Sequence, residues 1–163
     1  PVVSEKGLNH FLQWIEKAPL EGFEVLKKGG YLHPEKRGYY VKPSVHLREG
    51  LPTSSLTAGT YIDDEIFGPD AAIYIVRNLE EAIALNNRSR YGLVASIFSK
   101  SRKTFESAYG RMENGIVNWN VGTFRSSPLL PFGGLKQSGN FHPAGFFTPY
   151  FCTIPTASLE KLC

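Results

Sequence analysis

The sequence predicts an α/β domain in which a mostly parallel, open sheet is flanked by helices. The chain has 163 residues, 42% of them hydrophobic, which is enough for one domain with a buried core. Two segments repeat apolar residues at helical spacing, and short apolar runs alternate with helical segments from residue 70 onward. Strands that alternate with helices over short connections favour parallel pairing through right-handed crossovers.

The first helix is predicted over residues 4–17. Its apolar side chains recur at i, i+3, i+4 and i+7, which forms one stripe along a helix. They are Leu8, Phe11, Leu12 and Ile15. Ser4 precedes the stripe and is the candidate N-cap.

One strand is predicted between two irregular segments. Residues 28–38 and 48–63 are rich in turn-forming and loop-forming residues. Residues 39–47 are predicted to form a strand. Pro43 cannot donate to a ladder, so it belongs at an edge or a bend of the sheet.

The strands after residue 70 are short apolar runs. Residues 71–76 and 93–98 are predicted to be strands buried on both faces, as in parallel sheets with two covered faces. Residues 116–120 are predicted to form a third strand.

Two helices connect these strands. Asn78, with Glu81 three residues later, resembles a capping box and begins a helix that runs to about Asn87. Residues 101–113 place apolar side chains at helical spacing, and Gly115 is predicted to end that helix.

The last third of the chain has a different character. Residues 121–145 form a long irregular segment, and loops of this length are usually functional or disordered. Its aromatic residues argue against disorder, so we expect it to be ordered and to carry function. Residues 146–154, FFTPYFCTI, are predicted to form an apolar strand.

Composition excludes several classes of function. The net charge is +3 with no basic block, so neither nucleic acid nor a membrane surface is expected as a partner. No apolar run is long enough to cross a bilayer. Two cysteines make no disulfide framework and point to a reducing cytosol. No His or Cys pair has metal-ligand spacing, and no nucleophile–base set can be nominated from spacing.

Five segments in this order resemble the aldehyde dehydrogenase superfamily. They are EIFGP (65–69), EEAI (80–83), YGLVASIFS (91–99), GIVNWN (115–120) and PFGGLKQSG (131–139). PVVSEKG at the start is similar to the segment that follows the nucleophile region in that family, so the resemblance covers essentially the whole chain.

The last third also resembles a narrower group within the superfamily. These members oxidise N-succinylglutamate 5-semialdehyde to N-succinylglutamate in arginine breakdown. The resemblance implies a partial catalytic domain at residues 1–140 and an oligomerisation strand with its tail at residues 141–163.

The resemblance implies a cofactor role for Glu65 and Phe67. In the family, the Glu of EIFGP binds both hydroxyls of the nicotinamide ribose, because a carboxylate can accept two donors at once. Phe67 would limit the positions of the nicotinamide. NAD is the expected cofactor, with NADP as the alternative. The other interpretations are a solvated loop acid for Glu65 and a core ring for Phe67.

Four residues are the candidates for substrate binding. The resemblance implies that Phe132 lines the aldehyde tunnel, and Trp119 is either a site residue or part of the core. Arg125 and Ser126 stand where relatives often carry a Thr-Gly-Ala run. Arg125 is predicted to pair with a substrate carboxylate, or else to face solvent or a neighbouring subunit.

Residues 146–154 would join subunits by adding a strand to a partner's sheet. The expected partners are therefore an aldehyde substrate and further copies of the chain, in the cytoplasm. Cys152 lies in this strand and is expected to pack rather than to catalyse.

The family mechanism uses a cysteine nucleophile, a Glu general base and an oxyanion-stabilising Asn. In the family all three precede the segment that matches Pro1, so no catalytic residue is assigned. The chain begins with Pro1 and its only methionine is Met112, from which we expect a C-terminal fragment without dehydrogenase activity. The alternatives are a fragment of a glutamate 5-semialdehyde type dehydrogenase and a non-catalytic oligomerisation module.

Overall fold

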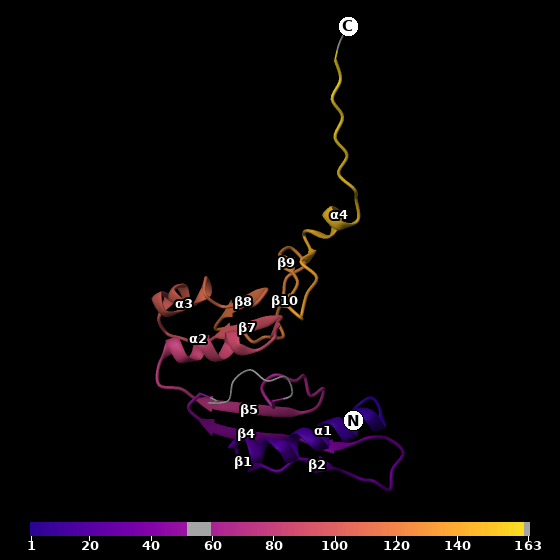
Figure 1. Cartoon of the computed structure of the whole chain (residues 1–163), viewed down its shortest axis with the longest axis vertical. Coiled ribbons are helices and arrows are strands. Elements are labelled where there is room, and N and C mark those ends of the chain that lie inside the picture. Colours follow the sequence, from indigo (N-terminus) through magenta and orange to yellow (C-terminus); the bar gives the residue numbers. More distant parts are fainter. Residues whose placement is uncertain (52–59, 162–163) are drawn as a thin grey trace. The chain divides into compact units, whose positions relative to one another are not determined.

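A computed structural model of the chain describes residues 1–51 and 60–161 (Figure 1). The chain divides into two compact units, Pro1–Arg88 and Ser89–Cys163, called unit 1 and unit 2 below. The loop expected at residues 48–63 lies partly outside the described residues, at 52–59.

Unit 1 is built on a three-stranded sheet with the order β1-β4-β5 (Figure 1). Its strands are β1 (Glu24–Lys27), β4 (Ser44–Glu49) and β5 (Asp70–Ile75). β1 runs antiparallel to β4, whereas β4 and β5 run parallel in an unbroken register from Ser44↔Asp70 to Glu49↔Ile75. The first residues of two strands that are far apart in sequence therefore lie side by side.

The remaining elements of unit 1 are short or helical. They are α1 (Glu5–Lys17), the 3₁₀ helix η1 (Ala18–Glu21), the pair β2 (Gly30–Tyr31) and β3 (Val41–Lys42), and α2 (Leu79–Arg88). The core gathers Trp14, Ala18, Phe23 and Tyr61, with Ile66 and Tyr74 packed against it.

The N-terminal helix confirms its prediction. Ser4 Oγ accepts the Gly7 backbone N–H at 3.1 Å and caps α1. Leu8 and Phe11 are buried as the stripe predicts, but Leu12 and Ile15 are only half-buried. Trp14 is buried with Leu8 and Phe11, so the buried face of α1 is rotated toward Trp14 relative to the predicted stripe.

The strand predicted at residues 39–47 is interrupted at Pro43. β3 ends at Lys42 and β4 begins at Ser44, whose N–H donates to the carbonyl of Pro69 at 3.0 Å. Pro43 has no N–H to give, so the chain bends there as expected. The preceding turn-rich segment also contains β2, which the sequence did not predict.

The prediction that residues 71–76 are buried on both faces is wrong. β5 exposes most of its side chains, including Ile73 and Ile75. It is the edge strand of its sheet, and burial on both faces requires a covering layer on each side. β7 (Val94–Ile97), in the second predicted strand, buries Ala95 but only half-buries its other side chains.

Unit 2 contains a strand–helix–strand segment with parallel strands, as predicted. β7 pairs with β8 (Ile116–Trp119) through α3 (Arg102–Tyr109). Shorter pairs follow: β6 (Tyr91–Gly92) with β10 (Leu135–Lys136), and β9 (Pro131–Phe132) with β11 (Ala144–Gly145). The segment 121–145 is therefore ordered through two-residue ladders.

The cap predicted at Asn78 is present with a change of partner, whereas the helix end predicted at Gly115 is wrong. Asn78 Oδ1 accepts the Glu81 N–H at 2.9 Å, while the Glu81 carboxylate accepts from the Arg77 N–H. α3 ends at Tyr109 rather than at residue 113, because Gly110 provides the C-cap before Gly115 is reached.

The strand predicted at residues 146–154 does not form. Thr148–Phe151 make one helical turn, α4, and residues 154–161 have no regular structure. A strand needs a ladder partner, and the described chain supplies none to this segment, while Pro149 favours the first turn of a helix. Cys152 is exposed rather than packed.

The α/β class with parallel strand pairs and flanking helices is confirmed. Among the described residues, no helix combines the length and the apolar character that crossing a membrane requires.

Candidate functional site

The EIFGP segment forms a loop that connects a turn at residues 61–64 to the first residue of β5. The Glu65 N–H donates to Asp64 Oδ1 at 3.1 Å, and the N–H of Asp70, which follows the segment, donates to the Gly68 carbonyl at 2.8 Å. Phe67 has a φ of +52°, in the left-handed region. The loop from residue 62 to residue 69 is called the 62–69 loop below.

Both residues predicted to bind the cofactor lie at the surface of this loop. The Glu65 side chain is exposed, and Phe67 is 75% exposed. They border a shallow hollow of about 470 Å³, which Tyr61, Asp70 and Tyr74 also line. A ring with this exposure is not part of a core, so the core interpretation of Phe67 is wrong.

Helix α1 packs against the backbone of the 62–69 loop. His10 Nε2 donates to the Glu65 carbonyl at 3.3 Å and lies 3.5 Å from Asp64 Oδ2. A Cβ built on Gly68 would meet the Phe11 ring at 2.4 Å, so only glycine fits between the loop and the helix. The loop backbone is therefore seated on α1 while the Glu65 and Phe67 side chains face outward.

These residues fit the nicotinamide end of a dinucleotide. An exposed carboxylate can accept from two ribose hydroxyls, and an exposed ring beside it can pack on a flat heterocycle. No group of three or more His, Cys, Asp or Glu side chains suited to a metal ion occurs in the described parts of the chain.

Beneath the loop lies a cluster of buried polar side chains that the sequence analysis missed. Asp70 accepts hydrogen bonds from Ser44 at 2.5 Å, from His46 at 3.1 Å and from the Tyr61 hydroxyl. Burial raises the pKa of the Tyr61 phenol, and its hydrogen bond to Asp70 raises it further. Burial also raises the pKa of Tyr74 to about 12.

In unit 2, the structure directs Trp119 toward a helix. Its ring stacks on Phe105 of α3 at 5.6 Å between centroids, and its Nε1 donates to the Ser99 carbonyl at 3.1 Å. The Arg102 guanidinium lies 5.7 Å above the same ring. These contacts favour the packing interpretation of Trp119.

Arg125 and Ser126 lie together in a hollow of about 260 Å³ beside β8. Both side chains are exposed. Asn118 lines the same hollow, and its Nδ2 donates to the carbonyls of Gly122 at 3.2 Å and Arg125 at 3.3 Å. The amide of Asn118 thus holds the loop that presents Arg125.

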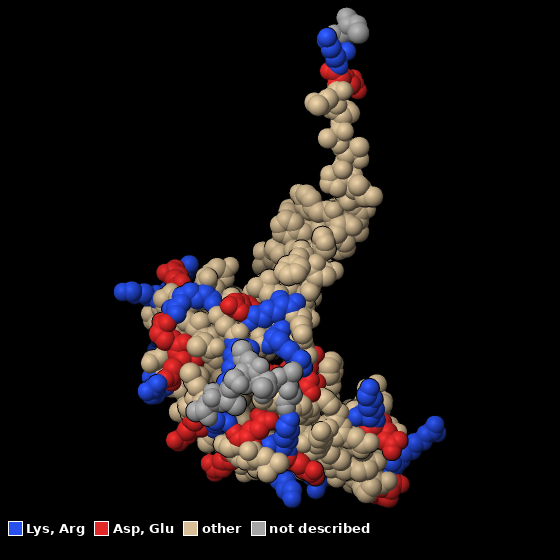
Figure 2. All heavy atoms as spheres, in the orientation of Figure 1, with Lys and Arg blue, Asp and Glu red and all other residues tan. Residues whose placement is uncertain are grey.

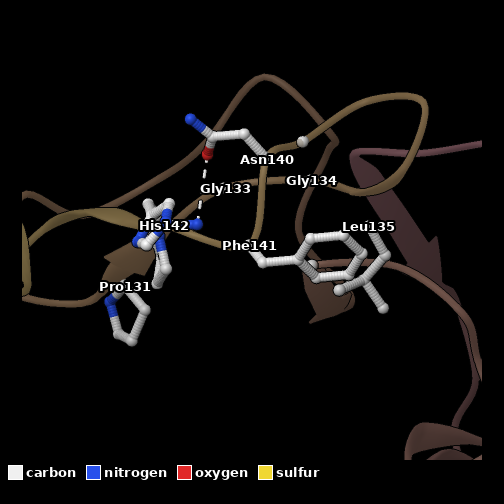
Figure 3. Close-up of a pocket in the computed structure, with 10 residues that line it drawn as sticks. Pro131, Gly133, Gly134, Leu135, Asn140, Phe141 and His142 are labelled. Carbon is white, nitrogen blue, oxygen red and sulfur yellow. Dashed lines mark hydrogen bonds between the residues drawn. The ribbon is translucent and has the colours of Figure 1, made fainter.

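Phe132 lies in β9 opposite Ala144 of β11 and is half-exposed. Its neighbours Pro131 and Gly133 line a second hollow of about 250 Å³, shown in Figure 3. In this view Phe141 and Leu135 lie on one side, and the Asn140 side chain accepts the His142 N–H at 3.1 Å. Four of the ten residues that line the hollow are glycines, namely Gly115, Gly133, Gly134 and Gly139.

Close backbone contacts explain the glycines of this region. A Cβ on Gly115 would lie 1.7 Å from the Gly133 carbonyl oxygen, and one on Gly139 would lie 1.8 Å from that of Gly134. PFGG can approach the residue before β8, and SGN can fold against PFGG, only because Gly115 and Gly139 have no side chain. Of the four candidate substrate-binding residues, the structure brings only Arg125 and Ser126 together in one hollow. Trp119 packs on Phe105, and Phe132 pairs with Ala144.

Comparison with known proteins agrees with the motifs. The model of the aldehyde dehydrogenase family matches residues 1–148. The chain is 40% identical over 99 residues to the N-succinylglutamate 5-semialdehyde dehydrogenase of Legionella pneumophila (strain Corby). That match covers 61% of this chain and 20% of the relative, so the chain matches about a fifth of that relative's length.

Solved structures give the same result. Aldehyde dehydrogenase C of Pseudomonas syringae, in complex with NAD⁺ and octanal, has a TM-score of 0.73 at 26% identity over 90% of this chain and 29% of its own. An aldehyde dehydrogenase of Physcomitrella patens, in complex with its reaction product succinate, has a TM-score of 0.71 at 27% identity, over 88% of this chain and 28% of its own. Motifs, fold and family model agree, and the chain belongs to the aldehyde dehydrogenase family.

Proposed function

We propose that this chain forms part of an NAD(P)-dependent dehydrogenase that oxidises N-succinylglutamate 5-semialdehyde to N-succinylglutamate in arginine catabolism. The observation that carries the proposal is the 62–69 loop, which is seated on α1 and presents Glu65 and Phe67 outward. The name of the Legionella pneumophila relative supports the choice of substrate.

Glu65 and Phe67 hold the cofactor in this proposal. The Glu65 carboxylate accepts from the ribose hydroxyls, and the Phe67 ring restricts the nicotinamide to one position. Bound NAD would supply the hydride acceptor, with NADP as the alternative. Hydride transfer depends strongly on geometry, so a ring that removes alternative positions contributes to the rate.

Arg125 recognises the far end of the substrate. N-succinylglutamate 5-semialdehyde has two carboxylates, and a guanidinium can bind a carboxylate through two parallel hydrogen bonds. The exposed Arg125 beside Ser126 and Asn118 supports this role.

Residues 146–154 join copies of the chain. No charged residue occurs between Lys136 and Glu160, and Figure 2 shows this stretch without the interspersed charges seen elsewhere. Exposed Phe146, Tyr150 and Ile154 are costly in water unless a partner covers them. We place the assembled protein in the cytoplasm.

The chain alone is inactive in this proposal, because it carries no match to the family's cysteine nucleophile and Glu base. An assay of the 163-residue chain with NAD⁺ and several aldehydes is expected to show no NADH. Measurable turnover would contradict this part of the proposal.

A chimera tests the substrate and the role of Glu65. This chain replaces the matching segment of the Legionella pneumophila relative, and kcat/KM is measured for the succinylated and the unmodified glutamate semialdehyde. We expect a preference for the succinylated substrate, and equal kcat/KM values would favour the glutamate 5-semialdehyde type.

In the same chimera, Glu65→Gln is expected to weaken the pre-steady-state NADH burst. Glu24→Gln, an exposed change in β1, is the matched control. A normal burst in Glu65→Gln would remove the cofactor role. A folded chimera that assembles through this chain but oxidises no aldehyde would favour the oligomerisation module.

A further inference from the structure

Unit 1 contains a buried polar cluster that the proposed function does not use. Its members are Ser44, His46, Tyr61 and Asp70, called the Asp70 cluster below. Ser44 is 2% exposed, His46 1% and Tyr61 3%, and the Asp70 side chain is 5% exposed. Buried polar groups of this kind must satisfy one another, because water cannot reach them.

The hydrogen bonds of the cluster form one consistent network. Asp70 Oδ1 accepts from Ser44 Oγ and from His46 Nδ1, while Asp70 Oδ2 accepts from the Tyr61 hydroxyl. The Tyr61 oxygen lies 2.9 Å from His46 Nδ1. Tyr61 has a single proton and gives it to Asp70, and an ionised carboxylate has none. His46 Nδ1 must therefore carry the proton that it shares with these two oxygens.

The cluster connects both ends of the 62–69 loop. Tyr61 immediately precedes the loop and Asp70 immediately follows it, and the bond between them closes the loop. Ser44 and His46 belong to the neighbouring strand β4, so they fix this closure to the sheet.

A second anchor holds the Tyr61 backbone. Its N–H donates to the Glu21 carboxylate, at 2.9 Å and 3.1 Å from the two oxygens. The Tyr61 ring also meets Phe23 edge-on at 4.8 Å between centroids. The start of the loop is therefore fixed by both backbone and side chain.

The middle of the loop has weaker support. His10 bonds the Glu65 carbonyl at an exposed site, and Gly68 rests on Phe11. Phe67 holds a left-handed backbone conformation that residues with a Cβ rarely adopt, so the loop keeps this conformation only if its surroundings enforce it.

We propose that the Asp70 cluster is the positioning device for Glu65 and Phe67. Tyr61 and His46 act through Asp70 to hold the two loop ends at a fixed separation, and this sets where the exposed carboxylate and ring point. The proposal rests on the proposed function in one respect, namely that Glu65 and Phe67 meet the cofactor.

Amide hydrogen exchange on the 163-residue chain tests the positioning without any cofactor. The readouts are the hydrogen-bonded amides of Asp63, Glu65 and Asp70. Tyr61→Phe is expected to accelerate them about tenfold, since one buried hydrogen bond to a charged group is lost. The control is Tyr31→Phe, which removes a hydroxyl bonded to the Gly38 carbonyl in the same unit.

Two results would overturn the proposal. In one, Tyr61→Phe leaves these three amides unchanged. In the other, it accelerates the amides of α1 and β4 by the same factor, which would make the cluster a general source of stability. Acceleration confined to the loop supports the proposal.

Two His46 variants distinguish the contribution of its N–H donor from that of the volume of its ring. Asn carries an N–H donor near the position of Nδ1, whereas Leu carries none. His46→Leu is expected to accelerate the loop amides and His46→Asn to restore most of their protection. If Asn is no better than Leu, the hydrogen bond of His46 does not position the loop.

The chimera described above links the cluster to the cofactor. Tyr61→Phe is expected to raise KM for NAD⁺ about tenfold. An unchanged KM in an active chimera, despite faster loop exchange, would refute the link. If the unmodified chimera itself oxidises no aldehyde, the proposed function has failed, and the exchange result still decides the positioning.

Discussion

The two units hold their functional loops by different physical means. In unit 1, the 62–69 loop is closed by hydrogen bonds among buried side chains, with Asp70 at the centre. In unit 2, the segment around Phe132 is held by close backbone contacts at glycines and by the two-residue β9–β11 ladder. The only side-chain amide that ties the Arg125 loop in the described structure is that of Asn118.

The difference indicates which changes each unit tolerates. A network of buried donors and acceptors is sensitive to the loss of a polar atom and to a change of protonation. Backbone packing between glycines is insensitive to pH but has no room for an added side chain. The chain has two tryptophans, Trp14 in unit 1 and Trp119 in unit 2, so variants with a single tryptophan can follow each unit separately.

The largest effect is expected from Gly115→Ala in unit 2. The new Cβ would overlap the Gly133 carbonyl at 1.7 Å, and backbone on both sides would have to move. We expect the free energy of unfolding of unit 2 to fall by about 3 kcal/mol or more, measured in urea from Trp119 fluorescence.

Gly110→Ala is the matched control, because a Cβ there meets nothing within 4 Å and the backbone is right-handed. It should change the stability by less than about 0.5 kcal/mol. Equal effects of the two substitutions would show that backbone packing does not hold unit 2.

The two units also differ in how far the sequence determines them. α1, its Ser4 cap and the start of α2 follow from contacts between residues three or four apart, and these were predicted. The hydrogen-bonded pairs of the Asp70 cluster are 9 to 26 residues apart in sequence, and the register between β4 and β5 sets Ser44 and His46 beside Asp70. No local pattern around His46 signals that arrangement.

The candidate site shows the same limit. The sequence could single out Glu65 and Phe67 as candidates because one contiguous motif contains both residues. The structure exposes both side chains on the same loop. The orientation of Trp119 depends on Phe105 in α3, a contact that periodicity cannot define. Residues 146–154 have strand composition, but a strand also needs a partner, which no single-chain pattern supplies.

High pH should weaken unit 1 through its buried phenols. The pKa values of Tyr61 and Tyr74 are raised in the folded state, so the folded chain binds these protons more tightly than the unfolded chain. Their contribution to stability is therefore complete below about pH 10 and is lost as the pH rises toward the folded values.

Urea unfolding followed by Trp14 should lose roughly 1 kcal/mol per phenol between about pH 9 and about pH 11. Tyr61→Phe and Tyr74→Phe should each flatten this loss, while Tyr40→Phe, a change at an exposed ring, should not. If the loss of stability at high pH remains in both Tyr61→Phe and Tyr74→Phe, groups other than these two phenols cause it.

A smaller effect is expected from Asn118→Ala in unit 2. The substitution removes both donors to the Gly122 and Arg125 carbonyls, which should cost about 1 kcal/mol of stability and loosen the Arg125 loop. In the chimera, KM for the succinylated semialdehyde should rise about fivefold with kcat nearly unchanged, as for a loss of uniform binding. Asn9→Ala, on the exposed face of α1, is the control. An unaltered KM in Asn118→Ala would mean that Asn118 does not contribute to substrate binding.

The smallest effect is expected from Arg102→Gln on α3. Arg102 bonds Glu106 at 2.8 Å, but the side chains are 72% and 58% exposed, and water and salt screen such a pair. Its position 5.7 Å from the Trp119 ring adds a second weak attraction. We expect unit 2 to lose about 0.5 kcal/mol or less, with the difference disappearing at high salt. A loss above about 1.5 kcal/mol would mean that surface charge stabilises the Phe105–Trp119 stack, and the account of unit 2 as held by backbone packing would have to include it.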